Sequence, residues 1–373
     1  MHVPIRIEVV PSDAKFLELK EAWNKLVKQT KHPHIFLTWE WLYTWWKHFG
    51  KQKESKILLA RNQNGDLVGI APFFKARERL GLQKLSQVKF LGTAPISSEY
   101  LDLIVSASLS QQVTHAFLAH LEDDKDLDLY CFTDSLPDSS LLSNYGRLLG
   151  NFKPVPAEVC PLINFPSSWE DYRQSISVRT RKYIQHIFKF FLQERGGTLK
   201  KASLRDFKPV LNRLFELHTR RWQSRGKEGS FVLEEKKRFH LEVSKRLCEN
   251  GQLGLYYLEL EGNIISILYG FYYQDTYYFY QSGFDLSYQK QSPGQVVLYH
   301  AIQDGFNSGI KRFDFLRGDE EYKLKWANGK NQTFNLMVPR TSKARLALSL
   351  AEKKAGLKKS LKNLLKKDSW FRI

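Results

Sequence analysis

The chain of 373 residues is too long for one ordinary hydrophobic core, so we expect two domains. Its formal net charge of +18 indicates an anionic partner: a nucleotide-bearing cofactor, an acidic lipid surface or a nucleic acid. The three widely spaced cysteines, Cys131, Cys160 and Cys248, indicate neither a disulfide framework nor a metal site.

The first half of the chain predicts an α/β lobe. Residues 1–10 suit a first strand better than a signal peptide. A helix follows from Ser12 or Asp13 to Gln29, and Thr38 is placed to cap a tryptophan-rich helix. The rings of that helix recur at helical spacing and are expected in the core: Trp41, Trp45 and Phe49. A hairpin is then predicted over residues 56–61 and 67–75, and further strands over 88–91, 101–105 and 126–132. A helix is predicted over residues 110–121.

No apolar run approaches the roughly 18 residues of a membrane span, so we expect a cytoplasmic protein, in solution or peripheral at the inner membrane face. The proline-rich stretch 153–166 is a poor helix and a candidate domain boundary. After it, Ser168 and Asp171 have the spacing of a capping box.

The second half begins with a basic helix over residues 176–197. Its cations Arg179, Arg181 and Lys182 lie at the end that the helix dipole disfavours, which indicates an anionic contact or a solvated basic face. The remaining pattern predicts three antiparallel strands, a crossover helix and one more strand in a mixed sheet. A strand and two helices come before them, over residues 198–202, 206–224 and 234–250. The three strands span 253–260, 264–273 and 276–284, the crossover helix 294–308 and the last strand 313–316.

A candidate anion site lies where the crossover helix begins. Pro293 suits a helix start, and Gly294 allows close approach of backbone to a ligand, so free amides would face a pyrophosphate. The segment partly matches the Gln/Arg-x-x-Gly-x-Gly/Ala loop by which GNAT acyltransferases hold coenzyme A. The alternative is that the proline and the glycine only mark the start of a helix. The candidate cofactor-binding residues are Gln289, Lys290, Gln291, Gly294, Gln295 and Val296.

From Pro161 to Trp326 the chain resembles the CelD/BcsL-like, or BioF-like, acetyltransferases of the GNAT superfamily, which are related to Fem-type aminoacyltransferases. The resemblance rests on SVRTRK at 177–182, LHTRRW at 217–222, SGFDLSYQKQSPGQVVL and FDFLRGDEEYKLKW. It implies a tandem GNAT-like, mixed α/β acyl-CoA N-acyltransferase fold. The expected parts are an N-terminal lobe (1–160), a catalytic domain (161–340) and a basic amphipathic tail (341–373).

Acyl transfer needs a general base, an acid for the leaving thiolate and a group that polarises the thioester. Asp319 or Glu320 is the predicted base and Tyr322 the acid, whereas Lys323 or Arg317 would stabilise negative charge or hold phosphate. An Arg317–Asp319 ion pair that only fixes the loop is the structural alternative. Flanking residues could serve acid/base chemistry or line the acceptor cleft, with core packing as the alternative: His218, Trp222, Phe239, His240 and Tyr280.

The sequence therefore predicts an acyltransferase that moves an acyl group, with acetyl expected, from acyl-CoA to an amine or hydroxyl in a polysaccharide or cell-envelope pathway. A Fem-like transferase using aminoacyl-tRNA and a non-catalytic membrane scaffold remain alternatives, and no motif indicates another nucleic-acid partner. The tail suits an anionic membrane surface or docking on the protein itself. Its apolar residues are Leu346, Leu350, Leu357, Leu361, Leu364, Leu365, Trp370 and Phe371.

Overall fold

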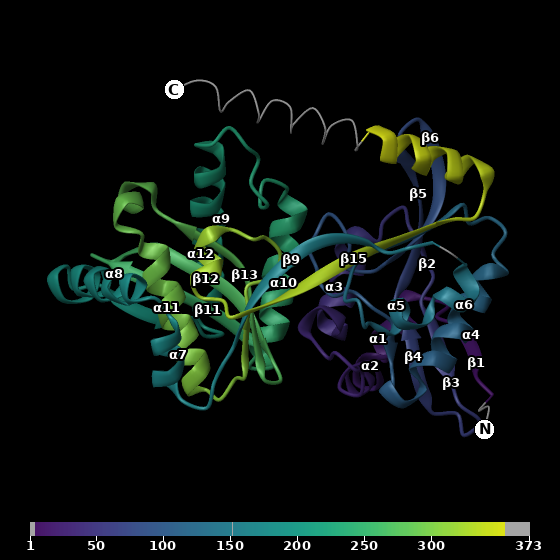
Figure 1. Ribbon diagram of the computed structural model, residues 1–373, viewed down its shortest axis with the longest axis horizontal. Helices are drawn as coiled ribbons and strands as arrows, with labels where there is room; N and C mark the ends of the chain where they lie inside the picture. The colour runs from purple at the N-terminus through teal and green to yellow at the C-terminus, as the bar shows by residue number, and fades with distance from the viewer. Residues whose placement is uncertain (1–3, 151, 355–373) are drawn as a thin grey trace.

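The computed structural model describes residues 4–150 and 152–354 and shows two lobes joined by a pair of long strands (Figure 1). The predicted mixed α/β, two-lobed architecture is confirmed. The N-terminal lobe contains β1 (Arg6–Val9), α1 (Asp13–Glu18), α2 (Lys20–Val27), α3 (Trp39–Phe49), β2 (Glu54–Ser55), β3 (Leu58–Arg61), β4 (Leu67–Ala71), β5 (Phe73–Leu80), β6 (Gln83–Phe90), β7 (Ile104–Val105), α4 (Ser110–Glu122), β8 (Leu129–Ser135), α5 (Ser140–Asn144) and α6 (Gly146–Leu149).

The C-terminal lobe follows the predicted order of elements. Its helices and strands are β9 (Val155–Asn164), α7 (Trp169–Ser175), α8 (Val178–Phe188), a π-helical turn (Lys189–Glu194), β10 (Thr198–Lys201), α9 (Phe207–Gln223), α10 (Glu234–Glu249), β11 (Leu253–Leu260), β12 (Asn263–Tyr273), β13 (Thr276–Phe284), a 3-10 turn (Leu286–Gln291), α11 (Pro293–Asn307), β14 (Arg312–Asp314), α12 (Glu321–Leu324) and β15 (Gly329–Pro339).

The β13–β14 pair determines where a pocket can form. The antiparallel trio β11–β12–β13 and the crossover through α11 to a parallel β14 are confirmed. The β13–β14 pairing runs only from Thr276 opposite Arg312 to Tyr278 opposite Asp314, whereas β13 continues to Phe284. Beyond Tyr278 of β13 and Asp314 of β14 the two segments have no paired residues. Side chains rather than hydrogen-bonded backbone therefore occupy the space between them.

Strands β9 and β15 carry the sheet from one lobe into the other (Figure 1). The eleven-stranded sheet has the order β10-β11-β12-β13-β14-β9-β15-β8-β6-β5-β2, while β1-β3-β4-β7 form a second sheet. The stretch 153–166 is therefore mostly strand, because its prolines disfavour a helix but tolerate an extended backbone. The predicted division at residues 160 and 161 lies within β9, and it stays a prediction.

The tryptophan-rich helix α3 joins the cores of the two lobes. Trp41 and Trp45 are buried, as predicted, and the Trp41 ring lies 5.2 Å from the ring of Phe239 on α10 and 5.3 Å from that of Phe271 on β12. Thr38 precedes the helix, but its hydroxyl donates to the carbonyl of Ile35 and makes no capping bond, so the predicted cap is wrong.

The tail begins as a helix over residues 342–354 at the N-terminal lobe (Figure 1). Ala344 and Ala347 pack in a cluster with Leu85 and Leu129, whereas Leu346 and Leu350 are each 55% exposed. One side of this helix is therefore docked on the protein, as one of the two alternatives predicted, and binding of the tail to a membrane stays a prediction. No helix in the described chain is both long and apolar enough to cross a bilayer. The remaining predicted apolar residues lie outside the described residues: Leu357, Leu361, Leu364, Leu365, Trp370 and Phe371.

Candidate active site

A pocket of about 190 Å³ lies where β13 and β14 separate. Both lobes contribute to it, since Ser97 and Glu99 come from the N-terminal lobe and every other lining residue comes from the C-terminal lobe. Several predicted site residues meet here although they come from different elements. The lining residues are Ser97, Glu99, Trp222, Phe279, Tyr280, Gln281, Ser282, Phe315, Leu316, Arg317, Glu320, Tyr322 and Lys323.

Arg317 pairs with the N-terminal lobe and not with Asp319. Its guanidinium forms an ion pair with Glu99, and a second one with Asp134 at 3.2 Å. Burial disfavours the charge of Arg317, but Glu99 and Asp134 outweigh that effect and raise its pKa. Leu316 turns the chain toward these carboxylates with φ of 55°, an uncommon value for a bulky residue. The predicted partner was wrong because Glu99 lies more than two hundred residues away along the chain.

Among the other charges of the loop, Lys323 and Glu320 form an ion pair that lines the pocket, whereas Asp319 lies outside it. Lys323 is buried, forms a 3.0 Å ion pair with Glu320 and donates to the carbonyl of Arg317. Asp319 is exposed and does not line the pocket. If Asp319 were the general base, its side chain would have to turn from solvent into the pocket. If Glu320 were the base, it would have to break its ion pair with Lys323.

Two tyrosines place phenol groups at the pocket. Burial and the nearby Glu320 raise the pKa of Tyr322, against the lowering effect of Arg221. Burial also raises the pKa of Tyr280, and the charge of Glu99 adds to the shift. Both phenols are therefore protonated at neutral pH, so Tyr322 carries the proton that the predicted donor needs, while its raised pKa makes that proton harder to release.

The two predicted histidines lie behind the pocket. His218 accepts a hydrogen bond of 2.9 Å from the indole nitrogen of Trp222, and burial lowers its pKa to about 4. His240 is buried, and burial lowers its pKa to about 3. Phe239 is fully buried beside it, so the core-packing alternative describes Phe239 and His240, whereas Trp222 and Tyr280 line the pocket.

The predicted anion site lies at the N-terminus of α11. Ser292, with φ of 54°, precedes the helix and accepts from the amide of Gln295. Within the described residues, the amides of Gly294 and Val296 form no hydrogen bond with a group outside α11. The side chain of Val296 is in the core, so only its amide is available, and the side chain of Gln295 accepts from Trp326. Gln289 and Lys290 are exposed, and Gln291 is half-buried.

Arg221 of α9 is a cation that the residue pattern did not single out. Its guanidinium lies 4.7 Å from the centre of the Phe284 ring, and a Cβ at Gly294 would lie 3.7 Å from the same ring. The buried Nε of Arg221 has no partner among the described residues. Burial and the neighbouring Arg225 lower its pKa. The run LHTRRW contained this residue, but only the fold shows that Arg221 turns inward while Arg220 is exposed.

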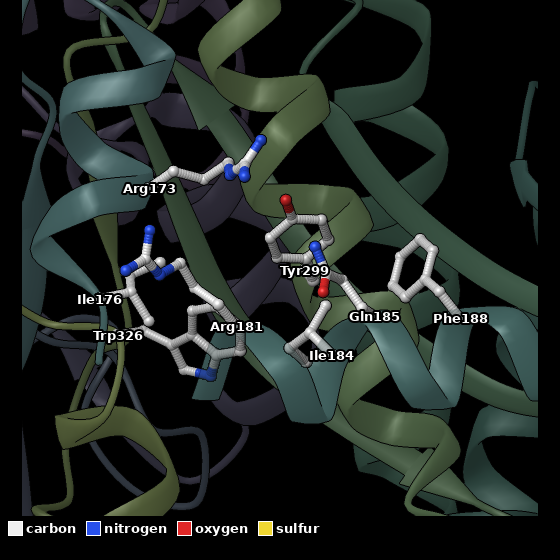
Figure 2. Close-up of a pocket in the computed structure, with 8 residues that line it drawn as sticks. All are labelled: Arg173, Ile176, Arg181, Ile184, Gln185, Phe188, Tyr299 and Trp326. Carbon is white, nitrogen blue, oxygen red and sulfur yellow. The ribbon is translucent and has the colours of Figure 1, made fainter. Parts of the chain in front are cut away.

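A second pocket, of about 160 Å³, lies between α7, α8 and α11 (Figure 2). Its walls are mostly apolar and include the rings of Phe188, Tyr299 and Trp326, while Arg173 and Arg181 supply positive charge. Trp326 also contacts Gln295, so this pocket adjoins the first turn of α11. Of the three cations predicted to meet an anion, Arg181 lines this pocket. No cluster of metal-binding side chains occurs in the described parts of the chain.

Comparisons with known proteins show similarity to a domain family and to several solved folds. Residues 180–324 match the model of the acetyltransferase (GNAT) domain, a span that contains α9 to β14 and most of the pocket. FemX superimposes with a TM-score of 0.60 at 12% identity, over 85% of this chain and 95% of FemX. L-PGS from Bacillus licheniformis gives a TM-score of 0.54 at 11% identity, over 89% of this chain and 95% of its own.

A third solved structure has a similar fold, and it is a conserved protein of unknown function from Bacteroides thetaiotaomicron. Its TM-score is 0.56 at 12% identity, over 90% of this chain and 99% of the other. No curated protein matches the sequence. Part of the C-terminal lobe thus matches a GNAT-type acetyltransferase domain, and the similarity of whole chains is one of the two-lobed fold.

Proposed function

We propose that the protein transfers an acyl group from acyl-CoA, with acetyl-CoA as the simplest donor, to an amine or hydroxyl acceptor. The carrying observation is the position of Arg221, which interacts with Glu320 and Tyr322 of the polar pocket and lies 4.7 Å from the centre of the Phe284 ring, the ring that a Cβ at Gly294 of α11 would contact. A helix N-terminus with unbonded amides favours a pyrophosphate, and a pocket beside it can hold the thioester. The expected cell-envelope or polysaccharide acceptor is part of this proposal.

The residues divide into donor-binding and reacting groups. The amides of Gly294 and Val296 and the guanidinium of Arg221 would hold the pyrophosphate, because Arg221 and Gly294 both lie against the ring of Phe284. The phenol of Tyr322 would protonate the leaving thiolate. Lys323 would stabilise negative charge while it remains paired with Glu320. The same ion pair would also hold the loop in place.

The donor site can be tested by calorimetric titration of acetyl-CoA. We expect Gly294→Trp to weaken binding by at least about tenfold, a loss of roughly 1.4 kcal/mol, because the indole would fill the space beside Phe284. Arg221→Gln should act in the same direction. Gly294→Ala is the matched control, since its Cβ would make only an ordinary contact of 3.7 Å. Equal affinities for all four proteins, or no binding by wild type, would contradict the proposal.

A transferase using aminoacyl-tRNA is the second candidate. It is favoured by the net charge of +18 and by the exposed Arg179 and Lys182 at the start of α8. This candidate predicts salt-sensitive binding of tRNA that acetyl-CoA does not displace. Under the acyl-CoA proposal, tRNA should bind no better than another RNA of the same length.

We also propose peripheral binding of the tail helix to an anionic membrane through its exposed leucines. Replacing Leu346 and Leu350 together with glutamine should weaken binding to phosphatidylglycerol vesicles by about tenfold, because two half-exposed apolar side chains lose their lipid contact. Leu204→Gln, at a similarly exposed leucine of the other lobe, is the control. Co-sedimentation that is the same for all variants, or absent for wild type, would refute membrane binding.

A further inference from the structure

A third pocket, polar and about 430 Å³ in volume, lies on the N-terminal lobe and shares no lining residue with the candidate active site. Three segments that are distant in the chain form its walls: the β5–β6 hairpin, the segment between α4 and β8, and the first turn of the tail helix. Figure 1 shows the hairpin beside the tail helix, where Leu85 packs with Ala344. The fold, and not one local motif, assembles this pocket.

The hairpin presents cations on one face. Arg77 lies opposite Ser86 and Arg79 opposite Lys84, so all four side chains point to the same side of the sheet. Arg77 and Lys84 line the pocket, are exposed and form no ion pair within residues 4–150 and 152–354. Like charges that lie directly opposite each other destabilise a sheet, and a bound anion would relieve the repulsion between Arg79 and Lys84.

The other two walls add no net charge to the pocket. Lys343 of the tail helix forms a 2.8 Å ion pair with Asp128, so their charges cancel. Lys125 and Asp126 both line the pocket, and they are exposed and opposite in sign. The lining as a whole holds four cations and two carboxylates, so its net charge of +2 is that of the hairpin cations.

Charged groups just outside the lining do not remove this surplus. Asp123 is exposed and has no ion pair among the described residues, but the same is true of Arg79, which offsets its charge. The other nearby carboxylates already have cations. These ion pairs are Glu78 with Lys89, Glu122 with Arg340, and Asp124 with both Lys56 and Lys75.

One lining hydroxyl, that of Ser86, lacks a partner. Ser86 is only 6% exposed, and Asp128 fixes its backbone. The Ser86 amide donates to the carboxylate of Asp128 at 2.9 Å, and the Asp128 amide donates to the Ser86 carbonyl, also at 2.9 Å. The Oγ of Ser86 is buried and has no hydrogen-bond partner in the described chain. Buried polar atoms are nearly always hydrogen-bonded, so a free hydroxyl beside unpaired cations indicates an acceptor on an anionic ligand.

We propose that this pocket binds a phosphate monoester, carried either by a soluble molecule or by a lipid headgroup. A phosphate monoester has a charge of about −1.5 to −2 at neutral pH, which matches the surplus, whereas a carboxylate has only one negative charge. Arg77 and Lys84 would neutralise it, and Ser86 Oγ would donate to one of its oxygens. The site is separate from the active-site pocket, so this inference does not depend on the proposed acyl transfer.

The tail helix provides a reason to include a lipid among the sources. Lys343, which lines the pocket, and the exposed Leu346 and Leu350 are spaced i, i+3 and i+7, so they share one side of the helix. A lipid whose phosphate occupied the pocket would therefore have apolar side chains beside it. A soluble ester would use the pocket alone.

The soluble probe is glycerol 3-phosphate, with glycerol as its uncharged match, titrated calorimetrically into the full-length protein at constant ionic strength. We expect wild type to bind the phosphate saturably and glycerol not at all. Arg77→Gln should weaken binding by at least about tenfold and Ser86→Ala by about tenfold, because each removes a donor to a charged group. Ser86→Ala should not lower stability in urea, since its hydroxyl has no partner in the described chain.

Arg205→Gln is the matched control. Arg205 is an exposed arginine of the C-terminal lobe that, like Arg77, forms no ion pair among the described residues. The substitution removes the same charge from the protein and should leave the affinity for glycerol 3-phosphate unchanged. An equal loss in Arg205→Gln and Arg77→Gln would show that only overall charge attracts the phosphate, and the inference would fail.

Co-sedimentation with phosphatidylcholine vesicles that contain phosphatidic acid distinguishes the two sources. A lipid headgroup predicts that Arg77→Gln and Ser86→Ala both lower vesicle binding and that glycerol 3-phosphate competes with the vesicles. A soluble ester predicts that both variants bind the vesicles as wild type does, while their affinity for glycerol 3-phosphate falls. The inference is overturned if wild type binds neither probe, or if both variants bind both probes as well as wild type.

Discussion

Arg317→Met is expected to lower the free energy of unfolding by about 3–5 kcal/mol, because it leaves carboxylates without their cation where the lobes meet. Glu99 is almost fully buried and Asp134 is half-buried, so neither gains enough hydration to compensate. Urea denaturation followed by tryptophan fluorescence would measure the change. The effect on stability is separable from catalysis, because it is measured without substrate.

Two further variants sharpen this prediction. Arg312→Met removes an exposed arginine that lies 3.8 Å from an exposed Asp275, so it should change stability far less. The double variant Arg317→Met with Glu99→Gln should recover part of the loss, since no charge remains at residue 99, with a coupling of about 0.5–3 kcal/mol. Equal effects of Arg317→Met and Arg312→Met would show that the interlobe ion pairs do not stabilise the fold.

Asp314 is expected to make the protein less stable as pH rises from about 4 to about 7. Burial raises its pKa to about 7, against the hydrogen bonds that it accepts from the Leu316 amide and the Tyr100 hydroxyl. A pKa that is higher in the folded state means that the folded protein binds the extra proton. That stabilisation is complete below the unfolded pKa, and it is lost as pH rises through the folded one. The shift corresponds to roughly 4 kcal/mol.

Asp314→Asn is the corresponding variant. Asparagine keeps an acceptor for the Leu316 amide and cannot ionise, so the loss of stability between pH 4 and 7 should become smaller. Burial raises the pKa of Asp102 to about 7 as well, and that residue supplies a pH dependence which should remain in the variant. Denaturation at a series of pH values measures both slopes. Identical slopes for wild type and Asp314→Asn would contradict the prediction.

The order of elements followed from sequence because it depends on short-range patterns. Hairpin-length turns and apolar alternation correctly predicted β11, β12 and β13, and the proline and glycine at residues 293 and 294 correctly marked the start of α11. The periodic tryptophans Trp41 and Trp45 were correctly expected in the core. These features need only neighbouring residues, so the local pattern determines them.

The same reasoning could not identify an element whose partners are distant in the chain. The prolines of the stretch 153–166 argue only against a helix, and the strands that pair with it, β14 and β15, come later in the chain. A strand is specified by what it pairs with, so its own composition left this element undetermined.

For the candidate site, sequence singled out one loop of the C-terminal lobe, and Arg317, Glu320, Tyr322 and Lys323 of that loop do line one pocket. Tertiary structure alone decided their partners and the missing members. Glu99 enters from the other lobe, Arg221 turns inward from α9, and Asp319 stays in solvent. The physical reason is that ion pairing and burial depend on distances across the fold, whereas spacing along the chain reports only which residues share an element.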